Sequence, residues 1–400
     1  MRRLLIVLFV ASVTLFSCDR KEMMEYTQEE QSYIKQNNDL AFSVIKYLQE
    51  VNSSENVVLS PLLLMTNLSL AANGADGETL KEFMQLLGVK ENNLDVLNSF
   101  CKKVINSSSE NDSVSTFMGN FVVINKGKEI MDSFIDAVQT NYEAEVESMD
   151  FSSKSSVERI NKWCSILTHG KIPKIIDGLN ENDVMYLLSS IYFEGKWKAE
   201  ELFEERNTEL GEFTNEQGIK SMVPLMWSWE KFDYYKGDNF ASLSIPYKGG
   251  YDFVVLLPDE GTTLKTMTSS FNQNEWEKML TQYSDTNDII LQLPKYDIDF
   301  NFSLNDFLKK AGVVTAFDPA QARFENICKQ KIYLSKVEQR SKISVNENGT
   351  QAASITSESM YQGFDTEPID FFVTRPFLYI IKESSTGAIL FIGFYNGEKE

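Results

Sequence analysis

The sequence contains a single histidine, His169, and this scarcity removes the usual basis for several kinds of catalysis. A Ser-His-Asp or Cys-His nucleophilic site would have to use His169, and an HExxH zinc site needs two histidines. No GxSxG elbow, Walker A loop or GxGxxG fingerprint occurs in the 400 residues. We expect His169 at a helix end beside Gly170, as a solvated side chain. The sequence therefore indicates no enzyme activity, no cofactor and no metal site.

Cysteine is also scarce, with four residues in the whole chain. Apart from Cys18, the chain has Cys101, Cys164 and Cys328, which form no close pairs and predict neither a disulfide framework nor a CxxC metal site. We expect these three as core or partly buried thiols. Pro/Gly/Ser-rich linkers are absent too. A length that alone suggests two or three domains therefore shows no boundary at which to divide it.

Basic residues are in deficit, since 38 Lys and Arg face 58 Asp and Glu, which gives a net charge of −20. Such a surface repels phosphate backbones, so nucleic-acid binding is disfavoured, and a basic heparin-like groove is equally disfavoured. Hydrophobic residues make up 42% of the chain and aromatic residues 12%, which is ample for a sizeable core.

The first residues have the pattern of an export signal. Arg2 and Arg3 form a positive region, residues 4–14 an apolar run, and residues 15–18 resemble a bacterial lipobox ending at Cys18. The apolar run is shorter than the roughly 20 residues that span a bilayer. We expect a signal peptide at 1–17, lipidation of Cys18 and a tether at 18–36, with the lipid anchor as the only membrane contact. The alternative is an ordinary secretory peptide with an incidental cysteine.

Hydrophobic periodicity predicts a mixture of helices and strands. A helix with one buried face is expected at 33–50, and another is expected to start after Ser60, which can cap it, with Pro61 in the first turn. A third is expected at 304–311. Strands are expected at 117–125, 184–193, 241–246, 251–258, 289–298 and 332–345.

The stretch 347–356 has no helical period and few large side chains. Read with a period of two, Thr350, Ala352, Ser354 and Thr356 share one face, and all four are small. A strand with so small an inward face can enter between two existing strands without forcing them apart. Residues 358–368 are polar and turn-rich, as expected of an exposed loop.

This stretch resembles the reactive-loop hinge of the serpins, and other segments resemble the same family. They are Gly74–Thr79, Ile191–Trp197, Phe371–Leu378 and Ile389–Gly393. The resemblance implies one α+β domain over 37–400, with three β-sheets, about eight or nine helices and an exposed reactive loop. It also implies a set of hinge residues, namely Glu347, Gly349, Thr350, Ala352, Ala353 and Ser354.

A serpin implies a suicide-type protease inhibitor that needs no catalytic residue of its own. The target protease cleaves the loop, and insertion of hinge 347–357 into the central sheet traps the acyl-enzyme. The alternatives are a non-inhibitory serpin acting as a binding or decoy protein, and an unrelated glycan-binding or hydrolytic lipoprotein. Glu358 has the parity of the inward face, where an unpaired carboxylate is costly and would stall full insertion unless it reaches water.

The family's spacing from the hinge glutamate places the reactive bond at Gly363-Phe364, with Met360 and Tyr361 as nearby alternatives. No Lys or Arg lies between Glu347 and Pro368. We therefore expect elastase-, chymotrypsin- or papain-like proteases as partners of a monomeric inhibitor, exported and anchored to the bacterial outer membrane on its periplasmic or cell-surface side.

The resemblance also implies a region that governs opening of the sheet, formed by Ser60, Ser189, Trp197 and Gln339. Leu63, Ser189 and Gln339 depart from residues common in the family at these positions, which are Ser, Asn and His. We expect Ser189 and Gln339 to form a hydrogen-bond network without a titrating group.

Overall fold

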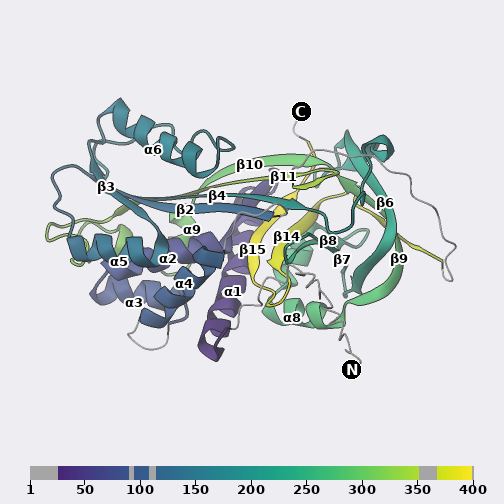
Figure 1. Cartoon of the computed structure of the whole chain (residues 1–400), viewed down its shortest axis with the longest axis horizontal. Helices are drawn as coiled ribbons and strands as arrows, with labels where there is room; N and C mark the ends of the chain where they lie inside the picture. Colours follow the sequence, from purple (N-terminus) through teal and green to yellow (C-terminus); the bar gives the residue numbers. More distant parts are fainter. Residues whose placement is uncertain (1–25, 90–93, 108–113, 351–366, 399–400) are drawn as a thin grey trace, which may run out of the picture.

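The computed structural model describes residues 26–89, 94–107, 114–350 and 367–398 (Figure 1). Within them the helices are α1 (Gln28–Val51), α2 (Pro61–Gly74), α3 (Gly77–Leu86), α4 (Asp95–Ser107), α5 (Asp132–Tyr142), α6 (Lys154–Leu167), α7 (Leu264–Ser270), α8 (Gln273–Gln282) and α9 (Asn305–Lys310). The strands are β1 (Val57–Leu59), β2 (Val114–Asn125), β3 (Glu145–Met149), β4 (Met185–Lys196), β5 (Glu209–Thr214), β6 (Lys220–Lys236), β7 (Phe240–Pro246), β8 (Tyr251–Pro258), β9 (Ser284–Pro294), β10 (Tyr296–Ser303), β11 (Leu334–Val345), β12 (Gly349–Thr350), β13 (Ile369–Phe372), β14 (Phe377–Glu383) and β15 (Ile389–Tyr395).

A six-stranded sheet runs through the middle of the molecule in the order β10-β11-β4-β2-β3, with the short β12 paired to β4. Strands β4 and β11 lie side by side and parallel, from Leu334 opposite Met185 to Lys342 opposite Tyr192. Figure 1 shows α6 on one side of this sheet and α2 to α5 on the other. Strand β4 lies between β11 and β2 and is covered on both faces of the sheet, which explains why it is almost continuously apolar and buried.

The remaining strands form a nine-stranded sheet in the order β1-β15-β14-β8-β7-β6-β9-β13, with β5 paired to β6. The long strand β6 joins its two parts, because it pairs with β5 at its start, with β9 from Leu225 to Tyr234 and with β7 over its last four residues. The expected α+β mixture of helices and strands is confirmed. Two of the three expected sheets are continuous through β6.

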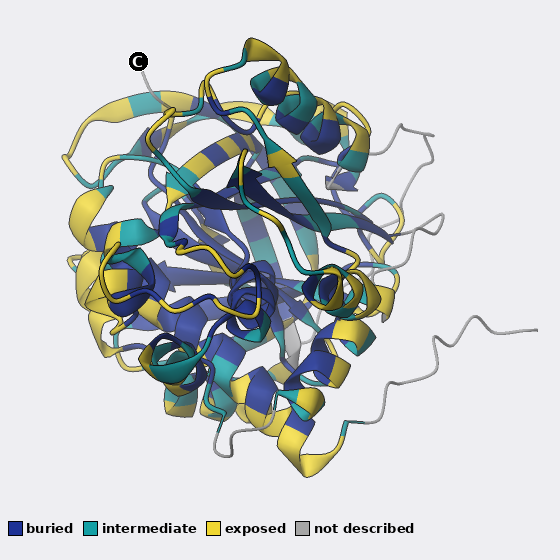
Figure 2. Cartoon of the chain, turned by 90° about the vertical axis from the view of Figure 1, so that its left-hand side faces the viewer, coloured by how far each residue is buried: buried dark blue, intermediate teal, exposed yellow. Residues whose placement is uncertain are grey.

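Two hydrophobic cores lie on opposite faces of the six-stranded sheet. The main core fills the space between the two sheets and helices α1 to α5. A smaller core lies under α6 and includes Phe121, Trp163, Cys164, Tyr186 and Leu188. Figure 2 shows the same division, with buried residues along the strands and on the inner sides of the helices.

Helix α1 begins earlier than the sequence pattern predicted. Thr27 and Glu30 form a capping box, in which Thr27 Oγ1 accepts from the Glu30 amide at 3.2 Å and Glu30 Oε2 accepts from the Thr27 amide at 2.8 Å. Tyr33 and Ile34 are already buried in the main core. The boundary expected between a tether at 18–36 and a domain at 37–400 therefore falls inside α1, and residues from Gln28 onward belong to the folded domain.

Other expectations can be compared with the structure directly. Ser60 caps α2 and Pro61 opens it, as predicted. The single strand expected at 289–298 is wrong, because the chain turns at Lys295 and divides into β9 and β10 of different sheets. Cys101, Cys164 and Cys328 are buried free thiols, as expected. In the part of the chain that the structure describes, no helix is long and apolar enough to cross a membrane.

Candidate functional site

The turn between β11 and β12 carries the start of the predicted hinge. Asn346 and Gly349 exchange backbone hydrogen bonds of 2.9 and 3.0 Å, and the Asn348 amide donates to Asn346 Oδ1 at 2.9 Å. Gly349 has a φ of 111°, and a Cβ atom on it would lie 2.1 Å from the Gly195 carbonyl oxygen. Only glycine fits this close backbone approach.

We call the line along which β4 and β11 pair the seam. After this turn the chain enters the end of the seam. In antiparallel pairing with β4, Gly349 lies opposite Lys196 and Thr350 lies opposite Gly195. The hairpin partner of Gly349 on the other side is Asn346, at the end of β11. The first two residues of the hinge strand are therefore already paired at the mouth of the seam.

The existing register can extend without any slip of β4 against β11. Continuing both pairings would place residue 358 between Leu187 and Val337, which already lie opposite each other in the closed sheet. Leu187 and Val337 belong to the main core, whereas Tyr186 and Leu188 face the smaller core under α6. Even-numbered hinge positions would thus face the main core, in agreement with the parity of Thr350, Ala352, Ser354 and Thr356.

Trp197 holds the base of the turn. Its ring is buried and stacks on Tyr247, with ring centroids 4.5 Å apart and an interplanar angle of 5°. Its Nε1 donates to the Asn346 carbonyl at 3.0 Å. The structure therefore places Trp197 at the point where the hinge enters the sheet.

Glu347 is buried in the same turn and joins it to the neighbouring sheet. Its Oε1 accepts from Thr208 Oγ1 at 2.8 Å, and its Oε2 lies 2.8 Å from Lys295 Nζ. Burial acts to raise the pKa of this carboxyl, but the hydrogen bonds from Lys295, Thr208 and the backbone outweigh burial and lower the pKa below its ordinary value. Glu347 is therefore a charged anchor of the hinge.

Replacing this anchor should destabilise the protein in a pH-dependent way. Glu347→Gln removes the ion pair with Lys295, and we expect a loss of roughly 1.5–3 kcal/mol at neutral pH, the range for a hydrogen bond to a charged group. Because the folded-state pKa is lowered, the stabilisation is complete above the unfolded-state pKa of about 4.3 and is lost as the pH falls through the folded-state value.

Denaturant unfolding of wild type and variant at a series of pH values measures this difference. Glu325→Gln is a suitable control. Glu325 is half exposed, and its ion pair with Arg323 is long, at 3.4 Å, so its loss should change stability little. A gap between wild type and Glu347→Gln that stays constant down to pH 3 would contradict the assignment.

Of the residues expected to govern sheet opening, Ser60, Ser189 and Gln339 lie together beneath the seam, whereas Trp197 lies at its mouth. Gln339 Oε1 accepts from the Ser60 amide at 2.8 Å, and Gln339 Nε2 donates to the Ser60 carbonyl at 3.1 Å. Ser189 lies opposite Gln339 across the seam and donates to the Glu338 carbonyl at 3.4 Å. The Leu63 amide donates to Ser60 Oγ at 3.1 Å. These contacts tie the start of α2 to β11 and β11 to β4, and none of the four side chains titrates near neutral pH.

No group of three or more His, Cys, Asp and Glu side chains that could hold a metal ion occurs in the described ranges. His169 is exposed, has a φ of 49°, and its ring centroid lies 4.4 Å from that of Phe117. It directly follows the C-cap Thr168, so His169 takes the left-handed C′ position.

A family model described as Serpin (serine protease inhibitor) matches residues 35–396, which is most of the chain. The chain belongs to the serpin family. Serpin B6 from Pongo abelii is 28% identical over 372 residues, covering 90% of this chain and 98% of the relative. Antithrombin-III from Mus musculus is 27% identical over 380 residues, covering 90% of this chain and 80% of the relative.

Among solved structures, the chain is similar to the thermophilic serpin tengpin in its native state. That match has a TM-score of 0.86 and 26% identity, and it covers 94% of this chain and 96% of tengpin. The description of the family model names serine protease inhibitors, and the expected serpin fold is confirmed over nearly the whole chain.

Several expected serpin sites lie outside the described residues. They are Cys18, the hinge residues Ala352, Ala353 and Ser354, Glu358, and the reactive-bond candidates Met360, Tyr361, Gly363 and Phe364. Their roles stay predictions.

Sequence reasoning missed the partners that hold the serpin hinge in place. Lys295 and Thr208 bind Glu347, although they lie 52 and 139 positions away along the chain. Neither residue has a local signal for this role. Both stand beside strand ends, which is where an ion pair between two sheets can form.

Proposed function

We propose that the protein is a suicide-type protease inhibitor that traps its target by inserting the hinge into the six-stranded sheet. The observation that carries the proposal is the pairing of Gly349 and Thr350 with the end of β4. This pairing has the direction that an inserted strand needs between the parallel strands β4 and β11. The small side chains that follow in the sequence support the same motion.

The energetics support a metastable intact state. Inserting about a dozen residues adds about a dozen ladder hydrogen bonds, at roughly 0.5–1.5 kcal/mol net each. The sum of about 6–18 kcal/mol is comparable with the whole stability of an ordinary domain, about 5–15 kcal/mol. A fold that withholds this much stabilisation is held kinetically and not by equilibrium.

The loop chemistry defines the class of target. With no Lys or Arg between Glu347 and Pro368, trypsin-like proteases lack a basic residue to bind. We propose elastase-, chymotrypsin- or papain-like proteases, which cut at Gly363-Phe364 or after the nearby Met360 or Tyr361. The protein supplies the cleavable loop and the strand that inserts, and the protease supplies the nucleophile.

The test is a complex that survives denaturing electrophoresis after incubation with elastase, chymotrypsin or papain. We expect a band at the summed mass of inhibitor and protease, and mass spectrometry should locate the cut within residues 360–365. Cleavage without a stable complex would contradict the inhibitor proposal, and a cut outside residues 360–365 would contradict the assigned bond.

A second candidate function is a non-inhibitory binding protein, and one structural feature favours it. A cavity of about 580 Å³ lies between α1, α8 and the turn at 385–386. Ile34, Trp276 and Leu280 form apolar walls, and the Lys35–Glu277 ion pair of 2.8 Å lies at its rim. Such a cavity suits an amphiphilic small molecule. Quenching of Trp276 fluorescence by amphiphiles, together with cleavage that yields no complex, would support this candidate.

The cellular location of the protein is part of the proposal. We propose export by the signal at 1–17 and lipid anchoring at Cys18, with the monomeric inhibitor displayed at the outer membrane. The first helix of the folded domain begins at Gln28, which leaves the nine residues 19–27 as the connection to Cys18. Cys18→Ser should release the protein from membranes into the soluble fraction, and an unchanged membrane fraction would count against lipidation.

A further inference from the structure

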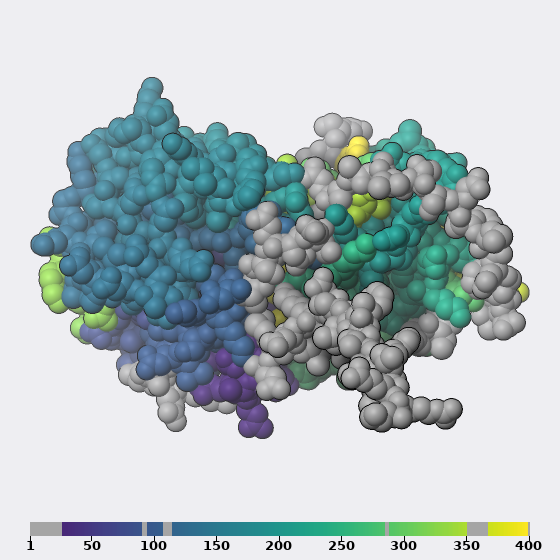
Figure 3. All heavy atoms as spheres, viewed as in Figure 1, coloured from purple at the N-terminus to yellow at the C-terminus, as the bar shows by residue number. Residues whose placement is uncertain are grey.

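The segment that follows α6 crosses the outer face of the seam between β4 and β11. We call residues 168–176 the strap. Its residues Ile172, Ile175 and Ile176 are buried in the smaller core under α6. In the space-filling view, the part of the chain around α6 forms the upper left of the molecule (Figure 3), and the ribbon view places α6 on one side of the six-stranded sheet (Figure 1). A strand that enters the seam must therefore pass beneath this cover.

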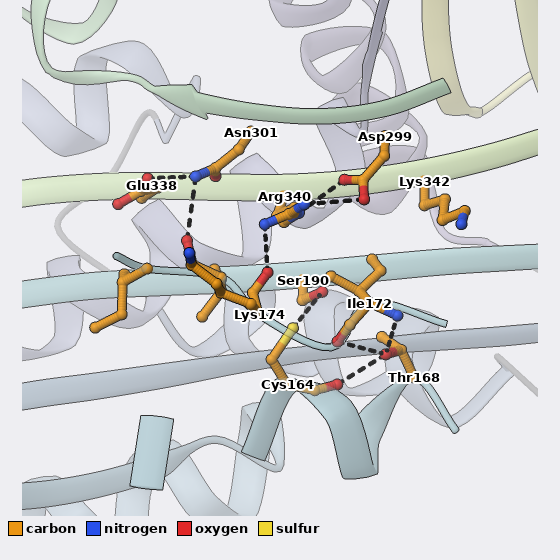
Figure 4. A network of polar contacts seen from close by, with 12 residues as sticks. Cys164, Thr168, Ile172, Lys174, Ser190, Asp299, Asn301, Glu338, Arg340 and Lys342 are labelled. Atoms are coloured by element: carbon orange, nitrogen blue, oxygen red, sulfur yellow. Dashed lines mark hydrogen bonds and ion pairs between the residues drawn. The ribbon is translucent and has the colours of Figure 1, made fainter. Parts of the chain in front are cut away.

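On one side the strap is fixed to α6 and β4. Asn161 of α6 accepts from the Ile175 and Ile176 amides at 2.8 and 3.1 Å, and it donates to the Ile176 carbonyl at 3.0 Å. Cys164 Sγ donates to Ser190 Oγ of β4 at 3.3 Å (Figure 4). Lys171 forms an ion pair of 3.1 Å with Glu194 of β4. These contacts make α6, the strap and β4 one unit.

On the other side of the seam, two side chains hold the strap to β10 and β11. Arg340 of β11 is fixed by Asp299 through bonds of 2.7 and 2.9 Å, and its Nη1 donates to the Lys174 carbonyl (Figure 4). Asn301 of β10 donates to the Ile175 carbonyl at 3.1 Å and to Glu338 Oε1 at 2.7 Å. The bidentate pair fixes the guanidinium plane, so the third bond is aimed at the strap.

We propose that Arg340 and Asn301 are positioning residues that clamp the strap across the seam, and that their release sets the rate at which the sheet opens. This inference rests on the proposed insertion of the hinge. A new strand moves β11 away from β4 by about 4.8 Å, the spacing of neighbouring strands. Hydrogen bonds near 3 Å cannot extend by that distance, so the bonds that Arg340 and Asn301 donate to the strap must break.

The clamp affects the outcome of inhibition because two events compete after the loop is cut. Insertion traps the acyl-enzyme, whereas deacylation releases an active protease and a spent inhibitor. A tighter clamp slows insertion and raises the fraction of inhibitor consumed without trapping. A weaker clamp speeds insertion but also lets the sheet of the intact protein open more often.

Arg340→Gln tests the clamp, and Lys342→Gln is the matched control. Lys342 follows two positions later on the same strand face and has a similar side-chain exposure, 24% against 21% for Arg340. It lies 3.7 Å from Asp297 in an ion pair. We expect Arg340→Gln to raise the rate of insertion after loop cleavage about tenfold, the effect of losing one charged hydrogen bond. Lys342→Gln should leave the rate within about twofold of wild type.

Two further measurements separate positioning from general stability. Arg340→Lys keeps a positive charge beside Asp299 but loses the fork that aims a third bond, so its rate should lie between those of wild type and Arg340→Gln. Asn301→Ala removes the second contact and should also speed insertion. In the intact protein, amide hydrogen exchange along β4 and β11 should rise in Arg340→Gln and Asn301→Ala, but not in Lys342→Gln.

The exchange measurement keeps the clamp distinguishable from the proposed function. If wild type never inserts its loop but seam exchange still rises in Arg340→Gln, the inhibitor mechanism fails and the clamp stands. If wild type inserts and Arg340→Gln matches Lys342→Gln in both insertion rate and exchange, the clamp is overturned.

Discussion

A single cut in the reactive loop near residue 363 is expected to raise the melting temperature by about 20 °C or more, although the cut removes a covalent bond. The reason is the set of ladder hydrogen bonds that only the inserted strand can make, at roughly 0.5–1.5 kcal/mol each. In an ordinary protein a nicked surface loop leaves stability unchanged or lowers it, so the sign of the effect alone is informative.

The measurement is a thermal melt of intact and cleaved protein at the same concentration, after the protease has been inactivated. Protein incubated with inactivated protease serves as the control, because any protection by bound enzyme would appear there too. Equal melting temperatures for intact and cleaved protein would contradict hinge insertion, whatever protease was used for the cut.

The register seen in the structure adds a limit to this expectation. Continued pairing would place position 358 between Leu187 and Val337, both buried in the main core. A carboxylate at that position lacks a partner among these neighbours, so full insertion is opposed there. Glu358→Ala should therefore raise the melting temperature of the cleaved form beyond that of cleaved wild type.

The hinge could be predicted from sequence because its signal is local. A run of small residues with a period of two is visible in the sequence at 350–356, and the glycine at 349 is required by a φ of 111° beside the Gly195 carbonyl. The helix start at Ser60-Pro61 was predictable for the same reason, since a cap and a first-turn proline act within one turn.

The contacts that hold the hinge and strap were not predictable, because they join residues far apart in the chain. Glu347 binds Lys295 across 52 positions, and Arg340 reaches the Lys174 carbonyl across 166. Similarly, 289–298 was predicted as one strand because its apolar pattern continues on both sides of Pro294 and Lys295. The two parts belong to β9 and β10, which lie in different sheets. Only the tertiary arrangement shows where such a pattern divides.

The second prediction with a large expected effect concerns the first residue that enters the seam. Thr350 lies opposite Gly195 at the mouth of the seam, and its parity assigns it to the face of the main core in an inserted strand. Thr350→Arg would require an unpaired guanidinium to be buried there, which costs several kcal/mol. We expect the variant to be cleaved at the same bond and rate, but to form no stable complex.

The same variant should also lose the thermal rise that follows cleavage, so the two largest predictions can be checked against each other. Asn348→Arg is the matched control, because Asn348 lies in the turn outside the paired strand, with its amide bonded to Asn346 Oδ1. It adds the same charge two positions earlier and should still trap its protease. If Thr350→Arg forms complexes as efficiently as Asn348→Arg, position 350 does not enter the sheet, and the pairing with Gly195 is not the start of insertion.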